Sequence, residues 1–381
     1  MNLKPNEPHI FSSTNFGTGT TIKILNQTDF ERFENLNKVL IDTEKMSTSF
    51  SEEFLRNEIT TLIHSVLKDP SHNDILITQL IDRLWDHSLD EFFALSEIEN
   101  IQILDDQNYD FIDSSIKKLK KEDLPKVVSQ TEHLYQTYQE IIGKPVIITK
   151  IKAGEPTKAE EKARQSFLIS LNLIRLYVPS AKPSLKGGLL QNWQTIRVFN
   201  ETKGELRQNS SHVGDISGVK VVILNQRNYL QLKEFGIDQL KVNNRISEVV
   251  KTCLYWYGLG IDEKHYSPRL LNFVTILEGS LKRKSEKTDL SKTVSERGAI
   301  LLGKTFEQRI SIREELKEIY TVRCTIVHTA NLDGDVDLAN RAGGYARGVL
   351  IKLIDLSKKY EGHFDNFIDD IDNAKLRGNI K

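Results

Sequence analysis

The segment TFEQRISIREELKEIYTVRCTIVH, residues 305–328, has the apolar spacing of one long amphipathic helix. At about 100° of turn per residue, four apolar residues lie within about 60° of Ile312: Leu316, Ile319, Ile326 and Val327. Arg323 falls at roughly 20°, near the middle of this stripe. The pattern therefore places a permanent charge on the face expected to be buried. Because an unpaired buried guanidinium is very costly, we expect a compensating carboxylate nearby.

The preceding helical segment, residues 267–283, offers that carboxylate. Its apolar face is formed by Leu270, Phe273, Val274, Leu277 and Leu281. Glu278 flanks this face, so we expect it to hold Arg323 by a bidentate contact. His328 lies about 140° around the helix from Arg323, in the last turn, where the helix dipole favours an imidazolium.

Arg323 and His328 permit two interpretations. An arginine that stabilises phosphorane charge and a histidine that moves protons together suffice for cleavage of RNA without a metal. The alternative is a structural Arg323–Glu278 pair, with His328 an ordinary surface residue near a helix end. These residues alone do not decide between catalysis and structure.

The C-terminal part, residues 241–381, reads as a helical bundle. Helical periodicity recurs at 245–261, 267–283, 290–303, 305–328 and 337–360. The short connections favour an antiparallel bundle of about five helices. The polar end, residues 369–381, is expected to be frayed.

The remaining chain mixes helix and strand signals. Strands are predicted at 20–27, 144–154, 192–201 and 219–226, and helices at 51–67, 73–95, 115–143 and 158–178. We expect a mixed, mostly helical region at 1–143 and an α/β region at 144–240, either separate from the first or continuous with it. The fold class is then mostly α, with an α+β N-terminal region and a C-terminal antiparallel helical bundle.

The amino-acid composition excludes several classes of protein. The 381 residues are 39% hydrophobic and 28% charged, with a formal net charge of −1, so no global basic field attracts nucleic acid. Two cysteines, Cys253 and Cys324, argue against a disulfide scaffold and a Cys-rich zinc site. The N-terminus lacks the apolar core of a secretory signal, and no apolar run is long enough for a membrane span. We expect a soluble cytoplasmic protein without a membrane partner.

Three segments in order carry a family resemblance. They are SPRLLNFVTILEGSL (267–281), SKTVSERGAILLG (291–303) and REELKEIYTVRCTIVHTA (313–330). Together they resemble the HEPN domain of the ApeA-like type across about residues 245–360. RCTIVH fits the family signature of an arginine, four to six residues and a histidine. The resemblance implies Arg323 and His328 as the catalytic pair and matches Glu278 to the family's acidic residue.

The resemblance also carries functional expectations. It implies a metal-independent endoribonuclease without a cofactor, which leaves 2′,3′-cyclic phosphate ends and dimerises so that two motifs form one composite cleft. It further implies a toxin-like or phage-defence effector, with residues 1–240 as sensor and a phage-derived trigger or regulatory partner. The alternative is a non-catalytic HEPN scaffold for dimerisation or RNA binding with a partner protein. A third hypothesis, nucleotide transfer by the middle region (144–240), is the weakest of the three, because no paired carboxylates accompany a Gly-Ser motif there.

Further residues are candidates for substrate binding. Cys324 occupies the polar position after the family's arginine, and Thr325 follows it, whereas Thr329 stands where the family commonly has glycine. Other candidates lie in the basic stretch 281–287 and on the last long helix: Lys282, Arg283, Arg341 and Arg347. Each of these cations also fits an ordinary solvated surface. Gly343 and Gly344 are expected to allow close helix packing rather than to form a phosphate loop.

Overall fold

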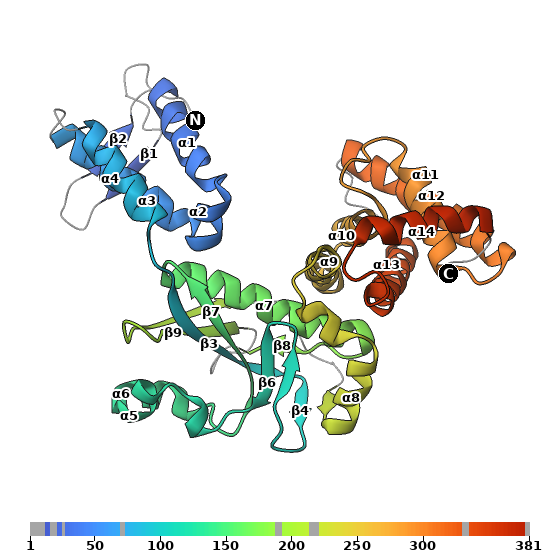
Figure 1. Ribbon diagram of the computed structural model, residues 1–381, viewed down its shortest axis with the longest axis horizontal. Helices are drawn as coiled ribbons and strands as arrows, with labels where there is room; N and C mark the ends of the chain where they lie inside the picture. Colours follow the sequence, from blue (N-terminus) through green and yellow to red (C-terminus); the bar gives the residue numbers. More distant parts are fainter. Residues whose placement is uncertain are drawn as a thin grey trace. The chain divides into compact units, whose positions relative to one another are not determined.

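The computed structural model describes residues 12–15, 21–24, 27–68, 73–186, 193–212, 221–329 and 335–377. It confirms a mostly α protein with an α+β N-terminal part and a helical C-terminal part (Figure 1). The described chain forms two compact units. The first draws on residues 1–94, 150–163 and 196–209, and the second on 95–149, 164–195 and 210–381. The main sheet therefore takes strands from both of the ranges 1–143 and 144–240.

The main sheet has the order β10-β9-β3-β7-β6-β5, and β8 pairs with β3. Its strands are β3 (Asp90–Glu99), β5 (Tyr109–Phe111), β6 (Ser114–Lys118), β7 (Pro145–Ala153), β8 (Ser184–Leu185), β9 (Trp193–Asn200) and β10 (Leu206–His212). β6 is antiparallel to both β5 and β7, and its Ile116 lies opposite Tyr109 and Ile147. All three side chains are buried, so this register keeps them in the core.

The first unit also contains the N-terminal helices and a two-stranded antiparallel sheet. These elements are β1 (Ser12–Asn15), β2 (Thr21–Ile24), α1 (Gln27–Ile41), α2 (Glu44–Ser49), α3 (Glu52–Lys68) and α4 (Asn73–Trp85). Met46, Phe50 and Leu55 belong to one buried apolar cluster of this unit. Gly154 approaches the ring of Phe50 so closely that an added Cβ would lie 2.4 Å from it.

The second unit adds a parallel strand pair and short helices to its part of the sheet. They are β4 (Ile101–Ile103), η2 (Lys121–Asp123), α5 (Lys126–Gln130), α6 (Glu132–Gln139), β11 (Val222–Leu224), α8 (Gln226–Glu234) and η3 (Ile237–Lys241). The long helix α7 (Pro156–Tyr177) runs from the first unit into the second.

The helical C-terminal part belongs entirely to the second unit. It consists of α9 (Arg245–Asp262), α10 (Tyr266–Leu281), α11 (Leu290–Leu302), α12 (Phe306–Thr329), α13 (Val336–Ser357) and α14 (Phe364–Arg377). α10 packs on α9 and α13, whereas α11 packs on α12 and α14. Asn244 and Asp335 begin α9 and α13 with side chains that accept backbone N–H groups at 2.9 and 2.8 Å. Gly303 follows the last residue of α11, at the end of the helical segment 290–303 predicted from the sequence.

Arg297 of α11 ties the bundle together. Its side chain is 4% exposed, and it donates bidentate hydrogen bonds to Glu286 and Asp372 as well as one to the Leu281 carbonyl oxygen. The arginine thus connects α11 with the end of α10, the following loop and α14. These partners compensate the buried charge of Arg297. Loss of any one of them would leave part of that charge without a partner.

Three sequence predictions were wrong. Residues 73–95 are not one helix: α4 ends at Trp85, and Asp90 begins the nearly fully buried strand β3, because a short apolar run does not distinguish a buried strand from a helix. Residues 115–143 begin as β6, held between β5 and β7. Residues 369–377 are not frayed, since they complete α14, which buries Phe367 and Ile371. The bundle therefore has one helix more than expected.

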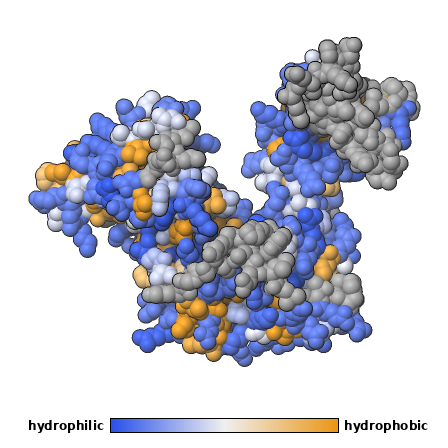
Figure 2. Space-filling view, turned by 180° about the vertical axis from the view of Figure 1, so that it is seen from behind, coloured by the Kyte–Doolittle hydropathy of each residue, from blue (hydrophilic) through white to orange (hydrophobic). Residues whose placement is uncertain are grey.

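None of the helices in the described ranges is long and apolar enough to cross a membrane. Hydrophilic residues predominate on the face drawn in Figure 2, and the hydrophobic residues form separate patches.

Candidate functional site

Arg323 and Glu278 meet between α12 and α10. The Arg323 Nη2 atom lies 3.4 Å from Oε1 of Glu278, so the ion pair expected from the sequence is present. The contact joins one nitrogen to one oxygen and is not the bidentate contact that we expected. Glu278 sits one turn before the end of α10, which brings its carboxylate to the middle of the last three turns of α12.

Tyr320 completes this cluster. Its hydroxyl donates a hydrogen bond of 2.5 Å to the same Glu278 oxygen, and the Arg323 guanidinium carbon lies 5.8 Å from the centre of its ring. Burial, together with the hydrogen bond to the Glu278 carboxylate, raises the pKa of Tyr320. The sequence carries one signal for this role: the tyrosine stands three residues before the arginine and therefore lies on the same helix face.

Arg323 is only partly buried. Its side chain is 32% exposed and that of Glu278 is 17% exposed, so the pair lies at the edge of the core. Leu316, Ile319 and Ile326 are buried as predicted. Val327 is 53% exposed, however, so the apolar stripe does not stay buried to the end of α12. The guanidinium can therefore face both Glu278 and solvent.

His328 is exposed in the last turn of α12. The helix is regular through Thr329, whose hydroxyl bonds to the Thr325 carbonyl oxygen at 2.7 Å. No distortion of the last turn brings His328 toward Arg323. Among the described residues, no hydrogen bond or ion pair holds the imidazole. Within one chain, the two residues thus occupy different sides of the same helix.

The polar residues after Arg323 lie on the outer part of α12. Cys324 is a free, half-buried thiol, whereas Cys253 on α9 is fully buried, which raises its pKa to about 11. Thr325 is exposed, and its hydroxyl donates to the Thr321 carbonyl oxygen at 3.2 Å. Both Cys324 and Thr325 are accessible neighbours of Arg323 in sequence.

The basic residues proposed for substrate binding do not gather in one place. Arg341 pairs with Glu315 and Glu318 of α12. Arg347 donates to the Leu176 carbonyl oxygen at 2.7 Å, near the end of α7. Hence neither cation of α13 joins the Arg323 cluster through a direct bond.

The basic stretch after α10 lies closer to the cluster. Lys282 and Arg283 line a surface hollow of about 530 Å³ together with Glu278. Arg283 bonds to Glu286 and Asp369, so acidic neighbours already compensate its charge. Lys282 makes no ion pair within the described residues, and the same holds for Lys284, which also lines the hollow, so both lysines are placed to meet a phosphate.

Potential metal ligands do not cluster in the described part of the chain: no three or more side chains of the kinds that ligate metals come together there. Comparison of the chain with protein-family models, with curated proteins and with solved structures gives no significant match.

Proposed function

We propose that this protein is a metal-independent endoribonuclease of the HEPN type, acting in the cytoplasm as a phage-defence or toxin-like effector. Residues 1–240 would then act as its sensor or regulator. The observation that carries the proposal is the cluster of Glu278, Tyr320 and Arg323, one and a half turns before the exposed His328. A guanidinium held at the edge of the core and partly open to solvent, with an exposed imidazole later on the same helix, supports an active site more than a buried structural pair.

The proposed reaction uses only protein groups and RNA. His328 removes the proton from a ribose 2′-hydroxyl, and the freed oxygen attacks the adjacent phosphorus. Arg323 stabilises the negative charge on the phosphorane oxygens. The bond to the 5′-oxygen breaks, and this oxygen takes up a proton from an imidazolium. The products are a 2′,3′-cyclic phosphate and a 5′-hydroxyl.

A second copy of the chain would complete the site. Arg323 and His328 diverge on one regular helix, so one phosphate is reached more easily by side chains from two copies of α12 related by a twofold axis. An exposed apolar side chain between the two residues supports such a contact, since Val327 is 53% exposed. In the composite site, His328 of one copy would act with Arg323 of the other.

The test is RNA cleavage by the purified chain in the presence of EDTA. Wild type is compared with His328→Ala and Arg323→Ala, and the products are mapped for cyclic phosphate ends. His363→Ala and Arg313→Ala serve as matched controls, because His363 is exposed, the Arg313 side chain is 41% exposed, and both residues lie in the same bundle. We expect cleavage by wild type and both controls and a loss of about 100-fold or more in each site variant.

Mixing the two site variants tests the composite site. If one copy supplies His328 and the other Arg323, a mixed dimer of His328→Ala and Arg323→Ala retains one intact cleft and regains part of the activity. Cleavage that persists in both site variants would contradict the assignment. The alternative is a non-catalytic scaffold that binds RNA or a partner protein. In that case neither wild type nor any variant should cleave RNA, and a scaffold that binds RNA should bind it in every variant.

A further inference from the structure

The surface hollow at the end of α10 adjoins the Arg323 cluster. Glu278 lines this hollow and also pairs with Arg323 at 3.4 Å, so the hollow and the cluster share one side chain. The other walls of the hollow come from the start of α9, the loop after α10 and the start of α14. A ligand in the hollow would therefore lie next to the residues proposed for catalysis.

The packing of α10 on α12 shows on which side of Arg323 the hollow lies. Near its end, α10 contacts Arg323 through Glu278. One turn later, Leu281 lies beside Leu316 at Gly298 of α11, where an added Cβ would be 3.5 Å from Leu281 and 2.6 Å from Leu316. The contact moves back along α12 as α10 proceeds, so the two helices run in opposite directions. The loop after α10 therefore lies beyond Arg323, on the side away from the last turn of α12.

The lining of the hollow carries more positive than negative charge. Four of its side chains are cationic and two are carboxylates. Arg245 and Arg283 each pair with a glutamate three residues later in the chain, at 3.1 and 3.4 Å. Lys282 and Lys284 make no such pair within the described residues. These two ammonium groups are available to an anion, and lysine is a common ligand of nucleic-acid phosphates.

The loop that carries the two lysines is held in place. The backbone N–H of Arg283 donates to Oε2 of Glu286 at 2.8 Å, and the N–H of Glu286 donates to the Arg283 carbonyl oxygen at 3.1 Å. The buried Arg297 donates two hydrogen bonds of 2.6 Å to the same carboxylate. Lys282 precedes this anchored turn and Lys284 lies within it. The loop backbone therefore loses little conformational freedom when a ligand binds.

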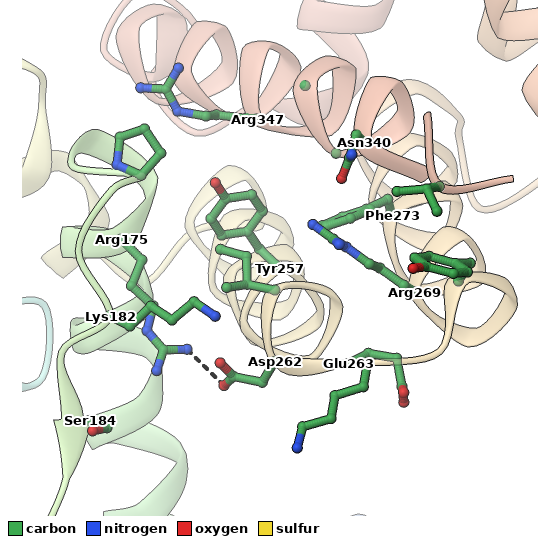
Figure 3. A pocket seen from close by; sticks show the side chains of 17 residues that line it. Arg175, Lys182, Ser184, Tyr257, Asp262, Glu263, Arg269, Phe273, Asn340 and Arg347 are labelled. Carbon is green, nitrogen blue, oxygen red and sulfur yellow. Dashed lines mark hydrogen bonds and ion pairs between the residues drawn. The ribbon is translucent and has the colours of Figure 1, made fainter. Parts of the chain in front are cut away.

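A larger cavity of the second unit lies elsewhere in the bundle. It has a volume of about 830 Å³, and its walls include parts of α7, α9, α10 and α13 (Figure 3). The buried Arg175 pairs with Asp262 at its edge, at 2.8 Å. Neither Glu278 nor Arg323 lines this cavity. Of the two spaces, the hollow is the one that an RNA strand at Arg323 can reach.

We propose that the hollow is an RNA subsite, in which Lys282 and Lys284 bind phosphates that neighbour the one contacted by Arg323. The inference rests on the proposed function for its ligand and adds the side on which the strand leaves the site. Contacts to phosphates carry no information on base identity. Phe364, the aromatic residue of the lining, is only 6% exposed and offers no open ring for a base. The subsite should therefore strengthen RNA binding without sequence preference.

RNA binding by the full chain tests the subsite without cleavage. The probes are fluorescent 2′-O-methyl oligonucleotides of uridine or of adenosine, about 12 nucleotides long, whose blocked 2′-oxygen cannot attack phosphorus. Anisotropy in EDTA is measured over a series of salt concentrations. Lys282→Gln/Lys284→Gln should bind both probes about tenfold more weakly at low salt. The slope of log K against log salt should become shallower by about 1.4, since each contacted phosphate of a single strand contributes about 0.7.

Lys352→Gln/Lys358→Gln is the matched control. It removes the same number of positive charges from exposed lysines at the end of α13, outside the hollow, and should bind like wild type. Circular dichroism and thermal unfolding confirm that each variant is folded. Wild-type affinity and salt slope in Lys282→Gln/Lys284→Gln would overturn the subsite. A loss restricted to one of the two probes, or a wild type that binds neither probe, would overturn it as well.

Cleavage of unmodified RNA separates this inference from the ribonuclease proposal. If both hold, wild type cleaves RNA, and Lys282→Gln/Lys284→Gln has a KM about tenfold higher. If wild type binds RNA through the two lysines but does not cleave it, the ribonuclease proposal fails and the hollow remains the RNA-binding surface of a scaffold. If wild type cleaves RNA and the lysine variant binds like wild type, the subsite alone fails.

Discussion

Tyr320 and Arg323 share one oxygen of Glu278: the tyrosine hydroxyl donates to it at 2.5 Å, and the Arg323 Nη2 atom lies 3.4 Å from it. Both contacts come from α12, so this helix holds the Glu278 carboxylate through a tyrosine hydroxyl and a guanidinium. Because the tyrosine hydrogen bond holds the carboxylate that Arg323 contacts, we predict that Tyr320 is a positioning residue for the arginine.

Tyr320→Phe should therefore reduce RNA cleavage without removal of a reacting group. Loss of the hydroxyl leaves the ring in place and frees Glu278, at a cost of about 1–2 kcal/mol in stability. We expect kcat to fall by about tenfold while the pH profile of cleavage keeps its shape. Tyr345→Phe, which removes a hydroxyl from the same bundle, is the control. If kcat were unchanged in Tyr320→Phe, Tyr320 would not be a positioning residue for Arg323.

Val327→Lys should disrupt the proposed dimer. Val327 is 53% exposed at the end of α12 and is not needed for the core. Two lysines facing each other across a twofold axis would repel and expose the apolar contact to water. Light scattering should show a monomer where wild type is a dimer, with cleavage lost at the same concentration. A wild-type chain that is monomeric at micromolar concentration would count against the composite site.

The two cysteines should react differently with maleimide at pH 7. Cys253 is fully buried and its pKa is raised to about 11, so it is neither accessible nor ionised. Cys324 is half-buried on the outer side of α12. Intact-mass analysis should show one label on the native chain, none on native Cys324→Ser and two on the denatured wild type. Two labels on the native protein would contradict the burial of Cys253.

Acid should destabilise the bundle through Glu286. Hydrogen bonds from Arg297 hold the pKa of this carboxyl below its ordinary value of 4.5. A lowered folded-state pKa means that the contribution to stability is fully present above pH 4.5 and is lost as the pH falls through the folded-state pKa. The thermal unfolding midpoint of wild type should therefore decrease as the pH is lowered through this acid range.

Glu286→Gln isolates that contribution. It should lower stability at pH 7 by about 1.5–3 kcal/mol and flatten the acid part of the pH profile. Glu248→Gln is the control, since Glu248 is an exposed carboxylate of α9 whose one ion pair within the described residues is with Arg245, three residues before it. A Glu286→Gln profile as steep as that of wild type would show that other carboxylates govern the acid transition.

Periodicity predicted the bundle well because its helices are long and each buries one face. The ends of α9, α11 and α12 lie within one residue of the predicted limits. The pairing of Arg323 with Glu278 also followed from helix geometry, since Arg323 lies within the apolar stripe of its helix and Glu278 flanks the apolar face of a neighbouring helix. The roles of Arg323 and His328 in catalysis remain predictions, which the cleavage assay tests.

Long-range pairing explains what the sequence did not reveal. β3 pairs with the distant strands β7 and β9, and β6 pairs with β7 as well as with the adjacent β5. The local pattern carries no trace of the distant partners. Arg297 contacts Asp372, 75 residues away, and the cavity joins residues of α7 to residues of α13. Neither contact has a spacing that could be recognised from a single sequence.

Asn172 of α7 has a consequence for how this protein can be divided. Its side-chain amide donates to the Leu254 carbonyl oxygen of α9 at 3.0 Å and fills the space that Gly258 leaves open, where an added Cβ would lie 2.1 Å from its nitrogen. A gene fragment that starts near codon 241 encodes every helix of the bundle but omits this amide, so α9 would keep a groove shaped for an absent side chain. Recombination at that boundary would yield a complete set of helices with an unfilled groove on α9, so a fragment that keeps this surface intact has to include α7.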